Sequence, residues 1–182
     1  MAETYDVLIK LVGNQNPCHM GHEIGTEWLW KNETPPDMCF AAYNSIYQFA
    51  TVLRTGGKFP WQDDPDVVTV SCPDPDVVNR FELTRIPGRK EPVESYDVKV
   101  SLVGKGVENP CTFGHTIGDE WLWDDMTPEK MCASAYRSII TNVLVMKYGG
   151  QLPWQKDPDV GLVSCPDPDV FNRFEIRRIP KK

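Results

Sequence analysis

The chain has 182 residues, of which 41% are hydrophobic and 25% charged, a composition typical of a folded globular protein. Its formal net charge of -7 gives no excess of cations to neutralise phosphates, so we expect neither nucleic acid nor an anionic membrane as a partner. No apolar run approaches the ~20 residues of a membrane helix, and no signal-peptide pattern opens the chain. We therefore expect a cytoplasmic protein whose thiols stay reduced.

In chain order, the sequence first shows that one module is present twice. When Cys18–Pro87 is aligned with Cys111–Pro180, about 42 of 70 positions are identical at a constant offset of 93. The pattern predicts a first module over 1–87, a polar linker over 88–94 and a second module over 95–182. Such a long period excludes a solenoid and favours two modules packed about a pseudo-two-fold axis.

Each module predicts two strands, one helix and two further strands, that is, an α+β fold with a helix on a small antiparallel sheet. Apolar residues alternate from Val7 to Leu11, which predicts the first strand, and "EWLW", at the end of "GHEIGTEWLW", predicts a second short strand. Thr34-Pro35 has the pattern of a helix start, and Gly56-Gly57 that of a helix end. "PDPD" predicts a turn before a last strand at Val77–Leu83. The same signals recur at Thr127-Pro128, Gly149-Gly150 and Val170–Ile176.

The six cysteines form three twinned pairs, which are Cys18 and Cys111, Cys39 and Cys132, and Cys72 and Cys165. Three thiols in a module cannot all pair internally, so a disulfide framework is disfavoured. A metal site is one alternative, because Cys18 and His22 are four residues apart and Cys39 and Cys72 could complete a Cys3His set for zinc or iron. In the second module this set would be Cys111, His115, Cys132 and Cys165. No C-x-x-C pattern supports it.

A reactive thiol is the other alternative. Cys39 and Cys132 fall in the first turns of the predicted helices, where the helix N-terminus favours a thiolate. His22 or His115 could then serve as the base, and so could Glu27 or Glu120. The simpler interpretation makes each cysteine a small buried apolar residue, and each glutamate a marker of the exposed face of its strand.

Tryptophans and arginines supply further candidate binding residues. Indoles could wall a ligand pocket, although core packing explains a Trp-Leu-Trp strand equally well. An arginine in "NRFE" could clamp a carboxylate or phosphate, or pair with Asp74 or Asp76. The candidates are Trp28, Trp61, Trp121, Trp154, Arg80 and Arg173.

The two modules agree best in their loops. "GH-x-IG-x-EWLW", "PWQ-x-DPDV" and "VSCPDPDV-x-NRFE" are shared, whereas the helix bodies differ. Loops usually diverge faster than the elements they join. Either the loops have fixed backbone requirements, or they build one site twice.

These strings carry a resemblance. Cys, Gly-His-x-x-Gly-Asp-Glu, Pro-Glu-x-Met-Cys, Gly-Gly-x-x-Pro-Trp, Asp-Pro-Asp and Cys-Pro-Asp-Pro together resemble a conserved hypothetical family of small bacterial and archaeal proteins, normally one module long. The resemblance implies that the three cysteines are a family feature and that the histidine is less regular. The chain departs from the pattern by its tandem fusion and by Thr26 in place of the aspartate that stands at Asp119. The family has no established activity.

The sequence thus predicts a small-molecule-binding protein or enzyme with a cysteine-containing loop site in each module. A metal-binding Cys/His module is the second hypothesis, and an accessory protein that docks a partner enzyme is the third. No phosphate-binding, dinucleotide-binding or serine-hydrolase motif is present in the sequence.

Overall fold

A computed structural model describes residues 3–88 and 94–181. The chain divides into two compact units, with the boundary between Val93 and Glu94. Apart from its end residues, the predicted linker 88–94 lies outside the described residues. Within the described part, no helix has both the length and the apolar character needed to cross a membrane.

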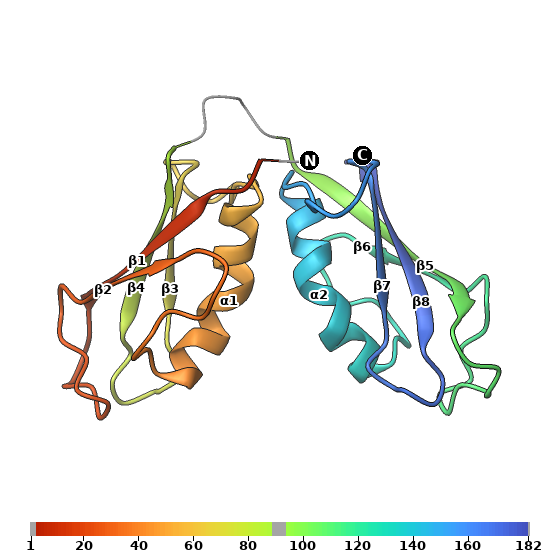
Figure 1. Ribbon diagram of the computed structural model, residues 1–182, viewed down its shortest axis with the longest axis horizontal. Coiled ribbons are helices and arrows are strands. Elements are labelled where there is room, and N and C mark those ends of the chain that lie inside the picture. The colour runs from red at the N-terminus through yellow and green to blue at the C-terminus, as the bar shows by residue number, and fades with distance from the viewer. Residues whose placement is uncertain (1–2, 89–93, 182) are drawn as a thin grey trace. The chain divides into compact units, whose positions relative to one another are not determined.

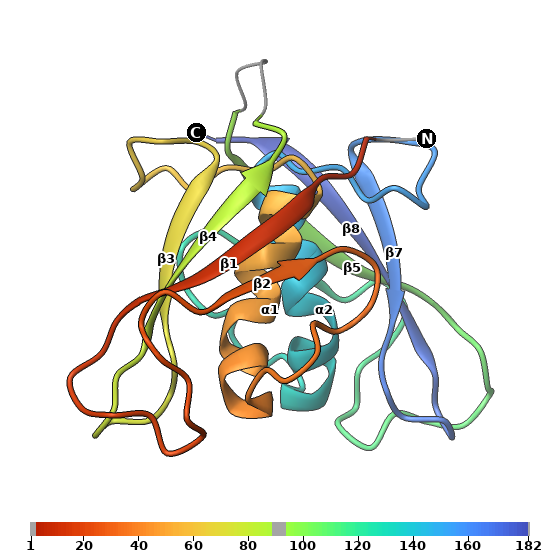
Figure 2. The same ribbon diagram turned by 60° about the vertical axis from the view of Figure 1, so that its left-hand side comes forward.

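The first module is one antiparallel sheet with a helix on one face (Figures 1 and 2). Its elements are β1 (Asp6–Gly13), β2 (Glu27–Trp30), α1 (Phe40–Arg54), β3 (Val67–Ser71) and β4 (Arg80–Ile86). The strands lie in the order β2-β1-β4-β3. The predicted α+β class, with a small antiparallel sheet and one helix in each module, is therefore confirmed.

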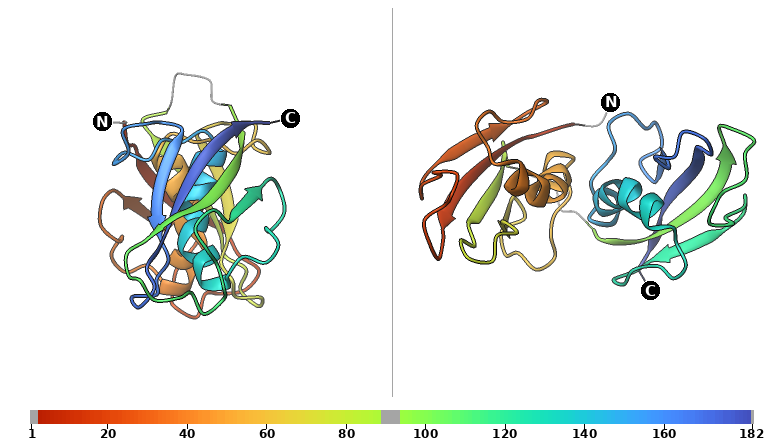
Figure 3. Two further views of the ribbon diagram at one scale, coloured as in Figure 1. Left: turned by 90° about the vertical axis from the view of Figure 1, so that its right-hand side faces the viewer. Right: turned by 90° about the horizontal axis from the view of Figure 1, so that it is seen from below.

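The second module repeats this arrangement, with strand order β6-β5-β8-β7. Viewed from below, each helix lies along a face of its own sheet (Figure 3, right). The elements are β5 (Tyr96–Lys105), β6 (Glu120–Trp123), α2 (Ala133–Lys147), β7 (Val160–Ser164) and β8 (Asn172–Pro180). Packing of the modules about a two-fold axis stays a prediction.

The core of each module lies between helix and sheet. Val7, Ile9 and Leu11 are at most 1% exposed, as their alternation along β1 predicts. From α1, Ile46 and Leu53 are buried to the same degree. The buried apolar face therefore fixes which side of the sheet the helix covers.

The helices begin later than the Thr-Pro pairs predict. Asp37 has a left-handed φ of 57°, which an α-helix cannot include, so the turn after Thr34-Pro35 does not continue. The helix starts at Phe40, and Cys39 is its N-cap rather than a first-turn residue. Lys130, with φ 58°, has the same effect in the second module, where Cys132 is the N-cap. The prediction of helix starts at Thr34-Pro35 and Thr127-Pro128 is wrong for this reason.

The helix ends are as predicted. Gly56 has φ 84°, and its N–H donates to the carbonyl of Leu53, while the N–H of Gly57 donates to that of Val52. These two bonds form a Schellman motif, in which a glycine at C′ accepts the left-handed conformation without strain. Gly149 and Gly150 end α2 in the same way.

The last strands also start later than predicted, because the valines after "PDPD" belong to the turn. The Asp74 carboxylate accepts the N–H groups of Asp76 and Val77, at 2.9 and 3.1 Å. Val78 then has φ 47°, a conformation that costs a β-branched residue on the order of 1–3 kcal/mol. Strand β4 consequently begins at Arg80 rather than Val77. Strand β8 begins at Asn172 rather than Val170, after Phe171 with φ 48°.

A buried arginine joins the helix end to the sheet. Arg85 of β4 is 1% exposed, and its guanidinium donates to the carbonyls of Leu53, Gly57 and Pro65 at 2.7–3.2 Å. It also forms a 2.7 Å ion pair with Asp66. In the second module Arg178 donates to the carbonyls of Met146 and Gly150 and pairs with Asp159. The shared "DPDV" loops therefore supply the acid that neutralises a buried cation.

Replacing this arginine should destabilise its module strongly. In Arg85→Met the carbonyls and Asp66 lose their donor, so we expect the free energy of unfolding to fall by about 3–5 kcal/mol. Urea unfolding followed by circular dichroism measures the effect. Arg80→Met, at an exposed position of the same strand, is the matched control and should change stability by less than about 0.5 kcal/mol. Equal effects of the two changes would contradict the anchoring role.

Candidate functional site: a cavity lined by three cysteines

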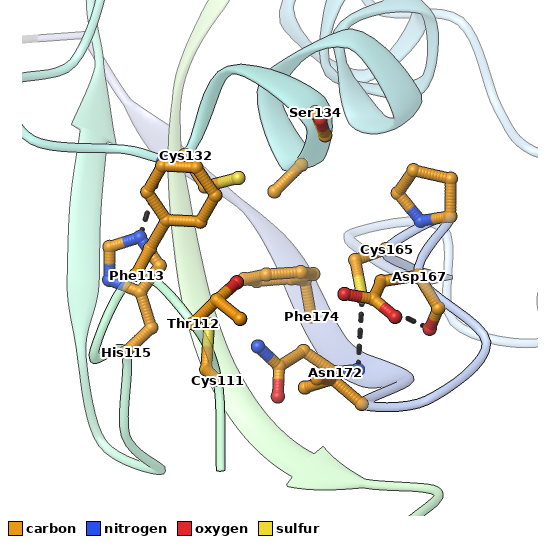
Figure 4. Close-up of a pocket in the computed structure, with 13 residues that line it drawn as sticks. Cys111, Thr112, Phe113, His115, Cys132, Ser134, Cys165, Asp167, Asn172 and Phe174 are labelled. Carbon is orange, nitrogen blue, oxygen red and sulfur yellow. Dashed lines mark hydrogen bonds between the residues drawn. The ribbon is translucent and has the colours of Figure 1, made fainter. Parts of the chain in front are cut away.

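Three cysteines of the second module line one cavity of about 280 Å³. Cys111 comes from the loop after β5, Cys132 from the N-cap of α2 and Cys165 from the end of β7. Figure 4 shows the three residues around the cavity, with Asn172 and Phe174 between Cys111 and Cys165. The alternative that the shared loops build a site gains support, because residues far apart in the sequence meet here.

The histidine lies at the N-terminal end of the helix. Nε2 of His22 accepts the backbone N–H of Cys39 at 3.2 Å, and Nε2 of His115 accepts that of Cys132 at the same distance. The imidazole thus satisfies a donor that a helix N-terminus usually leaves free. Since Nε2 is already an acceptor, a neutral ring carries its proton on Nδ1. The sequence suggests this histidine as a base for the neighbouring thiol. In the structure its Nε2 already accepts a backbone N–H, so this atom is not available to take the thiol proton.

The turn that follows the histidine, here called the histidine loop, covers Glu23–Thr26 in the first module and Thr116–Asp119 in the second. A different side chain accepts its backbone hydrogen bond in each module. In the second module Asp119 accepts the N–H of Thr116 at 2.9 Å, and its carboxylate lies 3.6 Å from Nδ1 of His115. In the first module Thr26 replaces the aspartate, and its hydroxyl accepts the N–H of Glu23 at 3.3 Å. The turn is the same, but only His115 has an acid beside Nδ1 in this position.

One asparagine in each module touches the cysteine at the end of the third strand. The N–H of Asn79 donates to Sγ of Cys72, and that of Asn172 to Sγ of Cys165, both at 3.2 Å. Both asparagines are 3% exposed, and in the described part of the chain their Oδ1 atoms have no hydrogen-bond partner. A buried acceptor without a donor is costly, so a ligand that donates to it would be stabilised.

The polar groups near Cys18 shift the ionisation of its thiol. Burial opposes ionisation, but the N–H of Met20, the side-chain amide of Asn79 and the N–H of His22 outweigh it and lower the pKa of the Cys18 thiol. Hydrogen bonds to sulfur favour the thiolate, which is the nucleophilic form. The sequence-based choice of Cys39 as the reactive thiol overlooked Cys18, because these donors are contributed by backbone conformation and by a distant residue.

The metal hypothesis is not supported by the placement of its ligands. Within residues 3–88 and 94–181, no three His, Cys, Asp or Glu side chains are grouped closely enough to hold a metal ion. The described cysteines are all free thiols. The proposed set of Cys18, His22, Cys39 and Cys72, like its twin, is therefore not assembled as a ligand shell for zinc or iron.

The predicted glutamates lie on the exposed faces of β2 and β6. Glu27 pairs with Lys10 and Glu120 with Lys99, both at 2.9 Å. The bond from Lys99 lowers the pKa of Glu120, which weakens it further as a base. Glu120 does not line the three-cysteine cavity of its module, but it lines a second hollow with His115 and Trp121. Their position agrees with the simpler interpretation of the sequence.

The tryptophans and arginines also lie apart from the cavity lining. Trp28 and Trp121 are 7% and 8% exposed and pack edge-on against His22 and His115, with ring centroids 5.1 Å apart. Trp61 and Trp154 are exposed by 56% and 61%. Arg80 and Arg173 occupy exposed positions at the start of their strands. Asp74, the suggested partner of Arg80, instead accepts backbone N–H groups in its own turn.

The residue that sequence reasoning missed is the asparagine of "NRFE". Its signal was present, since Asn79 and Asn172 are shared by both copies directly before the exposed arginine. The charge of the arginine suggests that it binds an anionic ligand. In the structure the asparagine is the residue that donates a hydrogen bond to a cysteine sulfur.

No protein-family model, no curated protein and no solved structure matches the chain.

The pH dependence of Cys18 alkylation tests the donor set. Because its pKa is lowered, Cys18 should reach its maximal rate with iodoacetamide at lower pH than an ordinary thiol. Asn79→Leu keeps the number and branching of the side-chain atoms but removes the amide donor, so the midpoint should move to higher pH. Mass spectrometry of the Cys18 peptide gives the rate. Asn32→Leu, at an exposed loop position, is the control, and an unchanged midpoint in Asn79→Leu would exclude the amide as a cause.

Proposed function

We propose that each module binds a small organic molecule in the space among its three cysteines, and that the thiols act chemically on it. The observation that carries this proposal is the convergence of Cys111, Cys132 and Cys165 on one cavity. The chain would therefore be a thiol-dependent binding protein or enzyme with one site in each module. A reducing cytoplasm would keep these thiols available.

The lining of the cavity indicates a compact ligand with an apolar part. Its volume of about 280 Å³ lies at the small end of ligand pockets. Phe113, Val170 and Phe174 offer apolar walls, while Asp167 and Asn172 offer polar atoms. The unpartnered Oδ1 of Asn172 favours a ligand that carries an N–H or O–H donor.

Filling the cavity should abolish binding. Ala135 lines the cavity from α2, and Ala133, two residues earlier, is exposed and is not among the lining residues. A library of small organic fragments would be screened by ligand-detected NMR against the wild-type protein, with hits required to protect Cys111, Cys132 and Cys165 from iodoacetamide. Because the first module would keep its own site, the readout is the protection of these three cysteines, which we expect Ala135→Leu to lose and Ala133→Leu to keep.

A second variant covers the case in which Ala135→Leu fails to fold, since overpacking a buried site costs typically about 1–3 kcal/mol. Ser134 lines the same cavity but is exposed, so Ser134→Phe should fold and still obstruct it. Hits that protect Cys111, Cys132 and Cys165 equally in the wild-type protein and in both obstructed variants would rule out this cavity as the binding site.

A further inference from the structure

One asparagine in each module lies beside thiols from separate segments. The backbone N–H of Asn79 donates to Sγ of Cys72 at 3.2 Å, and its side-chain amide contributes to lowering the pKa of the Cys18 thiol. The N–H of Cys72 donates in return to the carbonyl of Asn79 at 2.8 Å. In the second module Asn172 makes the same bond to Cys165, and Cys111 lines the cavity beside it (Figure 4).

The loops that carry the two thiols are also fixed to each other. The N–H of Gln15 donates to the carbonyl of Val77 at 2.8 Å, and the side chain of Asn16 donates to that of Asp76 at 2.7 Å. Asn109 makes the equivalent bond to Asp169 in the second module, at 2.9 Å. These hydrogen bonds therefore hold the segment before Cys18 against the turn that follows Cys72.

We propose that Cys18 with Cys72, and Cys111 with Cys165, are dithiol pairs that exchange with small organic disulfides. This inference rests on the proposed function, because it names the substrate class for the same cavity. A disulfide with short substituents suits a compact cavity with apolar walls and cysteines in its lining.

The chemistry assigns different roles to the two cysteines. The Cys18 thiolate attacks one sulfur of the substrate RSSR, so that a mixed disulfide forms, the substrate S–S bond breaks and RS⁻ leaves. Cys72 then attacks the Cys18 sulfur as a thiolate, after its proton has passed to the departing RS⁻. The Cys18–Cys72 bond forms, and a second RS⁻ leaves and takes a proton from water. The protein loses two electrons, and one disulfide becomes two thiols.

The donors around the sulfurs support this order. Cys18 has backbone and amide donors that favour its thiolate, which suits the attacking thiol. Cys39, at the N-cap, makes no capping hydrogen bond through its side chain, and its backbone N–H is bound by His22. The proposed pairing assigns no part in the exchange to Cys39 or Cys132, although Cys132 lines the same cavity.

The test treats the reduced full-length chain with bis(2-hydroxyethyl) disulfide, blocks residual thiols with iodoacetamide and maps peptides by mass spectrometry. We expect Cys18–Cys72 and Cys111–Cys165 bonds, with two 2-mercaptoethanol molecules released per bond. Cys72→Ser should instead accumulate a mixed disulfide on Cys18. Cys18→Ser should slow thiol release from the first module on the order of tenfold. Mixed disulfides mainly on Cys39 and Cys132, or no intramolecular bond, would overturn the pairing.

Two further arms separate this inference from the proposed function. If Ser134→Phe slows modification of Cys111 but no Cys111–Cys165 bond forms in the wild type, the cavity stands and the dithiol pair fails. If the bond forms equally fast in the wild type and Ser134→Phe, the pair stands and binding in the cavity fails. A parallel treatment with hydrogen peroxide tests the substrate class: bonds that form only with peroxide would exclude disulfide exchange.

Discussion

The buried arginine at the C-terminal end of each helix is the interaction on which the module depends. Arg85 binds the carbonyls of Leu53 and Gly57 near the helix end and the carboxylate of Asp66, so it connects helix, last strand and "DPDV" loop at one point. At the opposite end of the helix, His22 accepts the N–H of Cys39. With both ends held by side chains from the sheet and its loops, the helix cannot shift along the sheet, and the N-cap cysteine keeps a fixed place.

This arrangement explains why loops agree better than helix bodies between the two modules. The "DPDV" loop provides the partner of a buried cation, and the "CPDPDV" turn needs Asp74 as acceptor for two backbone N–H groups. These requirements are structural. The same turn nevertheless delivers Asn79 to the sulfur of Cys72, so one set of residues fixes the backbone and shapes the thiol site. The two explanations of loop agreement are therefore not exclusive.

The features predicted well from the sequence are those set by local pattern. Alternation along β1 and the glycine pair after the helix depend on side-chain period and on the left-handed φ of Gly56, both of which act within a few residues. The predicted helix start at Thr34-Pro35 was wrong, because nothing in the sequence marks Asp37 as a residue with a left-handed backbone conformation. The site residues were recovered only in part. The thiols were identified by chemical type, but the hydrogen bond from Asn79 to Sγ of Cys72 depends on tertiary placement.

The two modules share the scaffold of the site but not its whole lining. Phe113 stands where the first module has Met20, and Ser134 where it has Ala41, while Cys, Asn and the turn aspartate are common to both. The shared residues include the thiols and the apolar walls Val170 and Phe174, while Phe113 and Ser134 change the lining at two points. Under the proposed function, duplication with constant thiols and a changed lining would keep one chemistry while allowing two ligands. The histidine loop follows the same rule, since Thr26 and Asp119 close one turn but only the aspartate adds charge near the ring.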